Sequence, residues 1–210
     1  MLPAAAPAII TALCGLLPGL WPQHPLPSAL PAQIEQETCV TLRSARCFSP
    51  RAELKTSREY GFGLGQITVT PRFNNFEELK RRYPAQLGGW QWDRRYQVTE
   101  QLKALLLMDH SGYVACSSLF GTRFDALACS LSAYNGGLGG VRADRRLCSN
   151  TQGCDPLKWF GNVADTSTKS KTAASGYGKS FFQINREYVA NVLVTRRDKY
   201  VASMACGKEK

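Results

Sequence analysis

Five polar side chains along the sequence have the types and spacing needed for chemistry on a polar substrate. They are Glu37, Gln66, Tyr134, Asn135 and Tyr188. Glu37 follows an apolar helical pattern and lies close to the expected end of that helix. Loss of water and the negative end of the helix dipole both disfavour a carboxylate, so we expect a raised pKa for Glu37. A carboxyl that stays protonated near neutral pH can donate a proton to a leaving oxygen.

Short motifs surround these residues and follow one another in a fixed order. They are Gln36-Glu37-Thr38, Phe48-x-Pro50-x-Ala52, Ser57, Gly63-Leu64-Gly65-Gln66 and Ala133-Tyr134-Asn135-Gly136. In this order they resemble the catalytic motifs of the soluble-type lytic transglycosylases and goose-type lysozymes. The resemblance implies a mainly α, lysozyme-like single domain that cuts peptidoglycan glycan strands at the β-1,4 bond between MurNAc and GlcNAc.

The resemblance also implies a role for each of these residues. Glu37 would protonate the leaving oxygen and then take a proton from the 6-hydroxyl of N-acetylmuramic acid, which closes a 1,6-anhydro ring. Gln66 would line the cleft near the cut bond. The other implied substrate contacts are Thr38, Tyr134, Asn135 and Tyr188, the last within Arg186-Glu187-Tyr188-Val189. A core aromatic on the last helix is the alternative interpretation of Tyr188.

The chain departs from the family pattern at several positions. Tyr60 stands in place of a usual Gly, Gly61 in place of a usual Ala, and Gly65 in place of a usual Met. Thr38 stands where Ser is usual and retains a hydroxyl. The loop after Thr38 is longer than is common, and residues 138–176 are expanded. These differences concern substrate subsites rather than the catalytic acid.

Two alternatives stay open at this point. Most glycosidases use two carboxylates, and a hydrolytic muramidase would need a second acid, with Asp93 or Asp109 positioning a water. The alternative of another class is a non-catalytic wall-binding or phage tail structural protein that kept the fold. The presence of Glu37 and Gln66 together with the Tyr134-Asn135 pair argues against it, because drift would erase such a set.

The amino-acid composition fits one globular domain, and the net charge limits the classes of binding partner that we expect. The 210 residues are 44% hydrophobic and 20% charged, and the formal net charge is +10. Such a charge favours polyanions, either nucleic acid or an anionic cell envelope. The basic residues form short scattered clusters without zinc-finger spacing, so we expect no nucleic-acid partner. The expected partners are peptidoglycan glycan strands and the anionic envelope, and we expect a monomer.

Eight cysteines indicate an oxidising compartment. Two local pairs bracket polar loops and are expected to form disulfides: Cys39 with Cys47, and Cys148 with Cys154. Buried reduced thiols are the alternative, and the partners of Cys14 and Cys206 do not follow from the sequence. With no Cys-x-x-Cys and only two histidines, we expect no metal site. No cofactor motif is present, and we expect no cofactor.

Residues 1–27 combine an apolar segment with a Pro-rich loop, ahead of a catalytic domain expected over residues 28–210. The large apolar residues of the first segment have the spacing of one helix face. They are Ile9, Ile10, Leu13, Leu16, Leu17, Leu20 and Trp21. We favour a structural helix packed on the core over a signal-anchor that is later released from the membrane. No other segment could span a bilayer.

The expected site of action is the bacterial periplasm or cell wall. A compact lytic enzyme without a clear cleavable signal or wall-binding repeats suggests a bacteriophage or prophage product. Such a protein would act either as a lysis enzyme or as a virion-associated, wall-piercing one.

The remaining elements that must position the site are helical in pattern. We expect a short helix that Ser28 caps and that leads to Glu37, and further helices over residues 74–83 and 92–109, the last with Trp92 on its buried side. Phe120, Phe124, Leu127 and Leu131 step by four, three and four, which predicts a helix ending at Asn135-Gly136-Gly137. A last helix is expected from about Gly178. No alternating strand series is evident.

Overall fold

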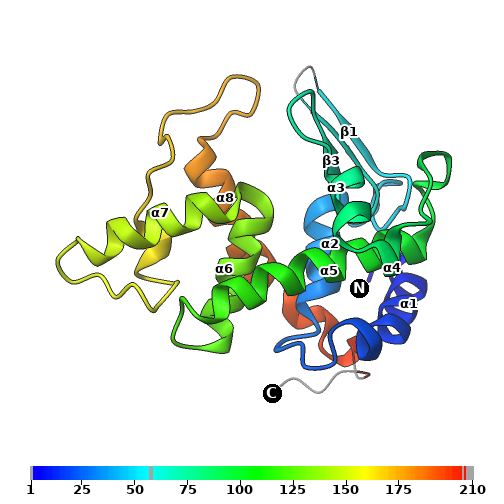
Figure 1. Ribbon diagram of the computed structural model, residues 1–210, viewed down its shortest axis with the longest axis horizontal. Helices are drawn as coiled ribbons and strands as arrows, with labels where there is room; N and C mark the ends of the chain where they lie inside the picture. Colours follow the sequence, from blue (N-terminus) through cyan, green and yellow to red (C-terminus); the bar gives the residue numbers. More distant parts are fainter. Residues whose placement is uncertain (1, 57–58, 205, 207–210) are drawn as a thin grey trace. The chain divides into compact units, whose positions relative to one another are not determined.

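The computed structural model describes residues 2–56, 59–204 and 206, and α-helices dominate this part of the chain (Figure 1). The helices are α1 (Ala6–Leu20), α2 (Ala29–Thr38), α3 (Asn75–Arg82), α4 (Pro84–Leu87), α5 (Val98–Ser117), α6 (Arg123–Gly136), α7 (Leu138–Ser149) and α8 (Phe181–Ala190). The predicted mainly α fold class is therefore confirmed. Ser57 of the sequence motifs lies outside the described residues.

Three short strands form an antiparallel sheet that the sequence did not predict. They are β1 (Glu53–Lys55), β2 (Tyr60–Phe62) and β3 (Ile67–Val69), in the order β1-β2-β3. Gly61 at the centre of β2 pairs with Leu54 on one side and Thr68 on the other. Each strand has three residues, which is too short for an alternating apolar pattern to be visible in the sequence.

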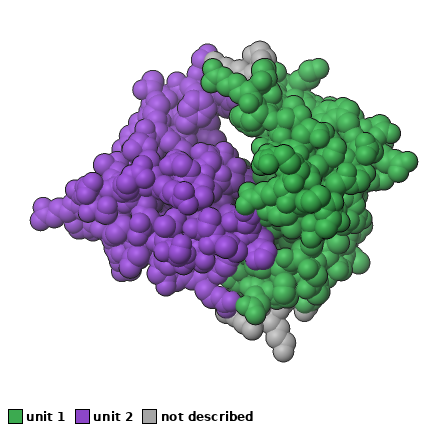
Figure 2. All heavy atoms as spheres, in the orientation of Figure 1, with its two compact units in different colours: residues 1–108, 196–210 green, residues 109–195 purple. Residues whose placement is uncertain are grey.

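The chain divides into two compact units, coloured separately in Figure 2. Unit 1 comprises residues 1–108 and 196–210, and unit 2 comprises residues 109–195. The boundary between them falls inside α5. Unit 1 therefore contains two separate stretches of sequence, whereas unit 2 is one continuous stretch.

The first helix of unit 1 packs by one face, as its apolar spacing predicts. α1 contacts α2 and the short 3-10 helix Ala202–Met204. Its buried residues are Ala6, Ile9, Ile10, Leu13 and Leu17. Ser28 occupies the predicted N-cap position of α2, but its side chain makes no capping hydrogen bond. Burial against neighbouring helices, rather than a cap, therefore holds α2 in place.

Aromatic side chains support the sheet of unit 1. Phe62 on β2 lies among Phe76 of α3 and Trp90, with ring centroids 6.1 and 6.2 Å away. The predicted helix over residues 92–109 begins later, at Val98, because a 3-10 turn occupies Trp92–Arg94. Trp92 is 42% exposed, so its predicted place on a buried helix face is wrong.

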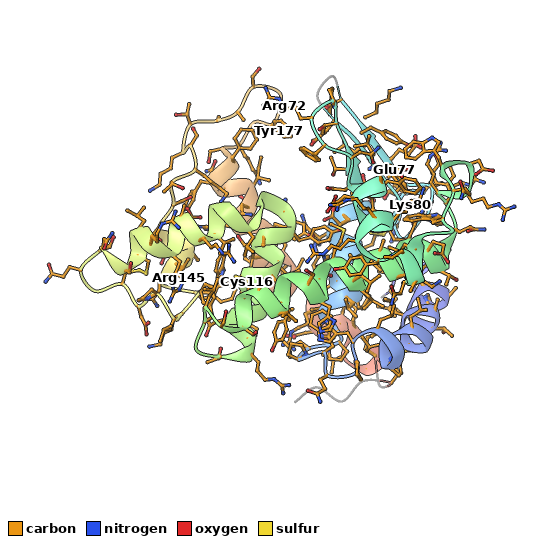
Figure 3. All side chains as sticks on the ribbon, viewed as in Figure 1. Arg72, Glu77, Lys80, Cys116, Arg145 and Tyr177 are labelled. Atoms are coloured by element: carbon orange, nitrogen blue, oxygen red, sulfur yellow. A yellow bond between two sulfur atoms is a disulfide. The ribbon has the colours of Figure 1, made fainter. Side chains whose placement is uncertain are left out.

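Unit 2 is built on α6, which contacts both α7 and α8. The Thr122 hydroxyl accepts a hydrogen bond from Asp125 N and caps α6, so Phe120, the first residue of the predicted stripe, lies before the helix. Gly137 follows the end of α6 with φ 81°, where the sequence predicted the turn. α7 follows at once in a stretch to which the sequence pattern assigned no helix. Figure 3 shows Arg145 extending from α7, and its Nε donates to carbonyls of the neighbouring loops.

Four disulfides cross-link the described residues. They are Cys14–Cys206, Cys39–Cys47, Cys116–Cys129 (Cys116 is labelled in Figure 3) and Cys148–Cys154. The two predicted pairs are confirmed. Disulfides in this number are compatible with an extracellular or periplasmic location. No helix among the described residues is both long and apolar enough to cross a membrane.

Candidate functional site

Glu37 lies in the last turn of α2, as the sequence predicts. It is half-buried, and α2 ends one residue later, at Thr38. The apolar residues before it, Leu30 and Ile34, are buried to 1% exposure or less. An acid in this position has apolar neighbours along its helix and lies at the negative end of the helix dipole.

Thr38 fixes the end of α2 to the segment that follows the disulfide loop. Its hydroxyl donates to Ile34 O at 2.6 Å and accepts a hydrogen bond from Phe48 N at 2.9 Å. Thr38 is 1% exposed. The hydroxyl predicted to contact substrate is thus engaged inside the protein, where it orients the residue next to Glu37.

Gln66 holds the Gly-rich turn through its side-chain amide. Gln66 Nε2 donates to Gly63 O at 2.8 Å and to Ala52 O at 3.1 Å. Gln66 Oε1 is buried and accepts no hydrogen bond among the described residues. A Cβ on Gly61 would lie 3.1 Å from that oxygen, so the glycine at the centre of β2 leaves room for it. The side-chain hydrogen bonds of Gln66 therefore stabilise the conformation of the turn.

Gln101 on α5 completes this frame and was not predicted from the sequence. It is fully buried, its Oε1 accepts from Leu64 N at 2.8 Å, and its Nε2 donates to Pro50 O and Arg95 O, both at 2.8 Å. A Cβ on Gly63 would lie 2.4 Å from the Gln101 amide carbon, and Gly63 has φ 77°. A side chain at Gly63 is thus excluded twice, by space and by backbone conformation.

Residues 48–52 join the two parts of the unit 1 site. Phe48 N bonds to Thr38 at one end of the segment, and Ala52 O accepts from Gln66 at the other. The motif residues Glu37-Thr38 and Gln66 thereby belong to one hydrogen-bonded frame. The residues predicted to contact substrate further along the chain, Tyr134, Asn135 and Tyr188, lie in unit 2.

Tyr134 and Tyr188 pack together within unit 2. Their ring centroids lie 6.4 Å apart with 11° between the planes. Tyr134 is half-buried, whereas Tyr188 is 4% exposed. Tyr188 is therefore a buried aromatic of α8 that supports the Tyr134 ring, which is the alternative that the sequence left open for it.

Asn135 is exposed in the last turn of α6 and is held by an asparagine that sequence reasoning missed. Asn185 Nδ2 donates to Asn135 Oδ1 at 3.0 Å and to Ser132 O at 2.9 Å. Asn185 Oδ1 accepts from Ser132 Oγ at 2.7 Å and from Arg186 Nη1 at 2.6 Å. Asn185 adjoins the Arg186-Glu187-Tyr188 motif, and that position was the available signal.

A buried carboxylate anchors Arg186. Asp144 is fully buried on α7, and its Oδ2 accepts from Arg186 Nη2 at 2.7 Å and from Lys169 Nζ at 3.3 Å. Burial raises the pKa of the Asp144 carboxyl, but hydrogen bonds from Thr168 N and Arg186, with the charge of Lys169, outweigh it and hold that pKa below its ordinary value. Asp144 is therefore an anion at neutral pH and orients the arginine.

A second polar cluster lies on the sheet of unit 1. Tyr60 Oη and Tyr96 Oη both donate to Glu53 Oε1, and these bonds lower the pKa of the exposed Glu53 carboxyl. Burial and the bond to Glu53 raise the pKa of Tyr60. The Arg95 guanidinium lies 4.4 Å from the Tyr96 ring centroid. Tyr60, which departs from the family pattern, thus has a structural partner on β1.

The described residues contain no group of three or more His, Cys, Asp or Glu side chains that could hold a metal ion. In unit 1 the candidate residues are the half-buried Glu37 at the end of α2 and the turn that Gln66 holds, and in unit 2 they are the exposed Asn135 and the Tyr134 ring stacked on Tyr188. No protein-family model and no curated protein matches the chain significantly.

Proposed function

We propose that the protein is a peptidoglycan-degrading glycosidase with a lysozyme-like fold, and that it acts as a lytic transglycosylase. The observation that carries the proposal is the ordered set of motifs with Glu37 in the last turn of α2. Glycosidic bond cleavage requires an acid that is protonated in the resting enzyme. Glu37 has an apolar helix face before it and a helix C-terminus around it, and both favour that state.

In the proposed reaction Glu37 acts twice. Its carboxyl proton passes to the oxygen that leaves toward N-acetylglucosamine as the bond to C1 of N-acetylmuramic acid breaks. The resulting carboxylate then takes the proton of the muramic 6-hydroxyl, whose oxygen bonds to C1 and closes the 1,6-anhydro ring. Protons and bonds balance without water, and Glu37 ends the cycle protonated.

The unit 2 residues would bind the sugar rather than react with it. Asn135 is exposed and carries an amide suited to the N-acetyl groups of the substrate. Tyr134, stacked on Tyr188, offers a supported ring and a hydroxyl. We assign Asn135 and Tyr134 to substrate binding, and we assign Thr38, Gln66 and Tyr188 to holding the site in shape.

The environments of the two candidate second acids favour a transglycosylase over a hydrolytic muramidase. Asp109 is 2% exposed, which suits a structural carboxyl better than one that positions a reactive water. Asp93 is exposed within the 3-10 turn Trp92–Arg94. Neither lies in a sequence motif, so the substrate's own hydroxyl is the more economical nucleophile.

We place the activity in the bacterial cell wall, in phage lysis or wall penetration. Four disulfides fit a protein that works outside the cytoplasm. The net charge of +10 favours approach to an anionic envelope.

A turbidity assay on outer-membrane-permeabilised cells tests the proposal. Glu37→Gln keeps the shape of the side chain but cannot donate a proton, so we expect lysis to fall at least about 100-fold. The matched control is Glu78→Gln, which removes an exposed carboxylate whose pairing with Arg81 contributes little. Lysis by Glu37→Gln at the control's rate would show that Glu37 is not the catalytic acid, whereas no lysis by the parent protein would favour a non-catalytic wall protein.

Digestion of purified peptidoglycan in heavy-oxygen water distinguishes the two enzyme classes. A transglycosylase leaves the new muramic acid ends unlabelled and one water lighter, whereas a hydrolase introduces the heavy isotope into each end. Label in most product ends would overturn the transglycosylase assignment and leave the muramidase.

A further inference from the structure

The side-chain amide of Asn185 has only one orientation that satisfies its neighbours. Its Oδ1 lies 2.6 Å from Arg186 Nη1, and a guanidinium can only donate. Its Nδ2 lies 2.9 Å from the carbonyl oxygen of Ser132, which can only accept. Exchanging oxygen and nitrogen would place a donor against a donor and an acceptor against an acceptor. Unlike most amides, Asn185 is therefore fixed by groups that cannot change role.

The fixed amide of Asn185 dictates the orientation of Asn135. The second hydrogen of Asn185 Nδ2 is directed at Asn135, 3.0 Å away, so Asn135 must turn its Oδ1 inward. The amide nitrogen of Asn135, on the other branch of the same carbon, then points away from Asn185. Asn135 is exposed. Asn135 thus presents N–H donors, and not its carbonyl oxygen, to anything that binds there.

Arg186 is immobilised by more than Asn185. Its Nη2 donates to Asp144 Oδ2 and to Thr166 O, both at 2.7 Å, and its Nε donates to Ala164 O at 2.8 Å. Its side chain is 11% exposed. The guanidinium therefore cannot turn to release the Asn185 oxygen without breaking an ion pair and several hydrogen bonds.

Gly136 supplies the space that this arrangement needs. A Cβ at position 136 would lie 2.8 Å from Asn185 Nδ2. A contact that short would displace the Asn185 amide from its bond with Asn135. The glycine at position 136 is therefore needed for the hydrogen bond between Asn185 and Asn135.

We propose that Asn185, held by Arg186, is a positioning residue that presents the Asn135 amide as a hydrogen-bond donor and so selects sugars with an acetamido carbonyl. This inference rests on the proposed function, because it assumes that Asn135 meets the glycan. Asn185 itself touches no substrate. Reversal of the Asn135 amide would present a carbonyl oxygen, which repels an acetamido oxygen and accepts from a free amine.

The test is binding of N-acetylglucosamine trimer and of its deacetylated counterpart, the glucosamine trimer, measured by calorimetry in the Glu37→Gln background so that no turnover occurs. We expect the acetylated trimer to be preferred. Asn185→Asp keeps an oxygen for Arg186 but removes the donor toward Asn135, so the Asn135 amide should reverse. The preference should then fall about tenfold, the effect of one hydrogen bond.

Asn150→Asp, at the exposed end of α7, is the matched control for the added charge and should leave the preference unchanged. Gly136→Ala is the second variant if Asn185→Asp does not fold, since it crowds the Asn185 amide without removing a polar group. It should reduce the preference in the same direction. Rescue of the preference by Asn185→Gln is not expected, because the longer side chain displaces the amide.

Nuclear magnetic resonance of the Asn135 side-chain amide supplies a readout that a purely structural role would not move. In the parent protein the Asn135 NH2 signals should shift on addition of the acetylated trimer, and in Asn185→Asp they should not. Equal binding of the two trimers by the parent, binding of neither, or an unchanged preference in Asn185→Asp would each overturn the inference. Failure of the proposed function would instead appear as no lysis by the parent protein, and failure of the role of Glu37 as lysis by Glu37→Gln.

Discussion

Both units contain a buried carboxylate with two cations, but the cations come from very different distances along the chain. Glu35 of unit 1 is 1% exposed and bonds to Arg196 at 2.9 Å and Lys199 at 2.8 Å, residues more than 160 positions away. Asp144 of unit 2 bonds to Lys169 and Arg186, at most 42 positions away. Each unit thus contains a buried acid whose charge is balanced by nearby cations.

The one long-range disulfide among the described residues lies in unit 1, whereas the other three, including Cys39–Cys47 of unit 1, are local. In unit 1, Cys14–Cys206 closes a loop with a sequence separation of 192. In unit 2, Cys116–Cys129 and Cys148–Cys154 have separations of 13 and 6. Long loops lose more entropy on closure than short ones. Unit 1 therefore depends on the return of the chain end, whereas unit 2 is held by contacts within its own stretch.

Loss of the long-range disulfide should lower the free energy of unfolding more than any other change proposed here. Replacing Cys14 and Cys206 together by Ser should reduce the free energy of unfolding by about 5 kcal/mol in the chain-entropy model. The Cys148→Ser/Cys154→Ser control should reduce it by only about 2.5 kcal/mol. Guanidinium unfolding under non-reducing conditions measures both. A larger loss for the short bridge would contradict the dependence of unit 1 on the chain end.

Removal of the charge of Asp144 should cause the second-largest loss of stability. Asp144→Asn leaves Arg186 and Lys169, whose side chains are 11% and 15% exposed, without their anion. Breaking a buried ion pair in this way costs about 3–5 kcal/mol of unfolding free energy. Urea unfolding measures the loss. A change near zero would mean that the backbone carbonyls around Arg186 are sufficient to hold it.

The equivalent change in unit 1 should be smaller. Glu35→Gln also removes a buried anion, but Arg196 and Lys199 are 26% and 29% exposed and can recover water. We expect a loss of about 2 kcal/mol, between the values for buried and surface pairs. The same urea titration should rank it below Asp144→Asn. The reverse order would show that the contact with Tyr200 Oη, at 2.5 Å, carries more than the two cations.

Acid should weaken unit 2 through Asp144. Its pKa in the folded protein is lower than its ordinary value, so its stabilisation is fully present above that ordinary value, near pH 4, and is lost as pH falls through the folded-state pKa. Stability measured from pH 6 to pH 2 should decline more steeply below pH 4 in the parent than in Asp144→Asn. Parallel curves would exclude Asp144 as the source of the decline.

The sequence predicted the elements whose apolar residues repeat over several turns. The stripe of α1 and the turn at Gly137 follow from periodicity and from glycine conformation. α7 was not predicted, because it contains two glycines and three arginines and buries only Val141, Asp144 and Cys148, which is too few for an apolar pattern. Strands of three residues are too short to produce a pattern at all.

The candidate site was predictable only where its residues lie in motifs. Glu37, Gln66, Tyr134 and Asn135 could be named from the sequence, and their roles stay predictions. Gln101 and Asn185 were not named, because their roles depend on contacts such as those with Leu64 and Ser132, which are 37 and 53 positions away. Spacing along the chain gives no measure of such contacts.

The loop of residues 40–46 offers a place to modify the protein without touching its candidate acid. The Cys39–Cys47 disulfide and the bond from Phe48 N to Thr38 close the loop at its base. Val40 is 77% exposed and Leu42 is 40% exposed, so the tip contributes little to the core. A fluorophore, an affinity tag or a short wall-targeting peptide inserted at the tip should leave the end of α2 undisturbed. The closed base makes this loop a natural attachment point for engineering.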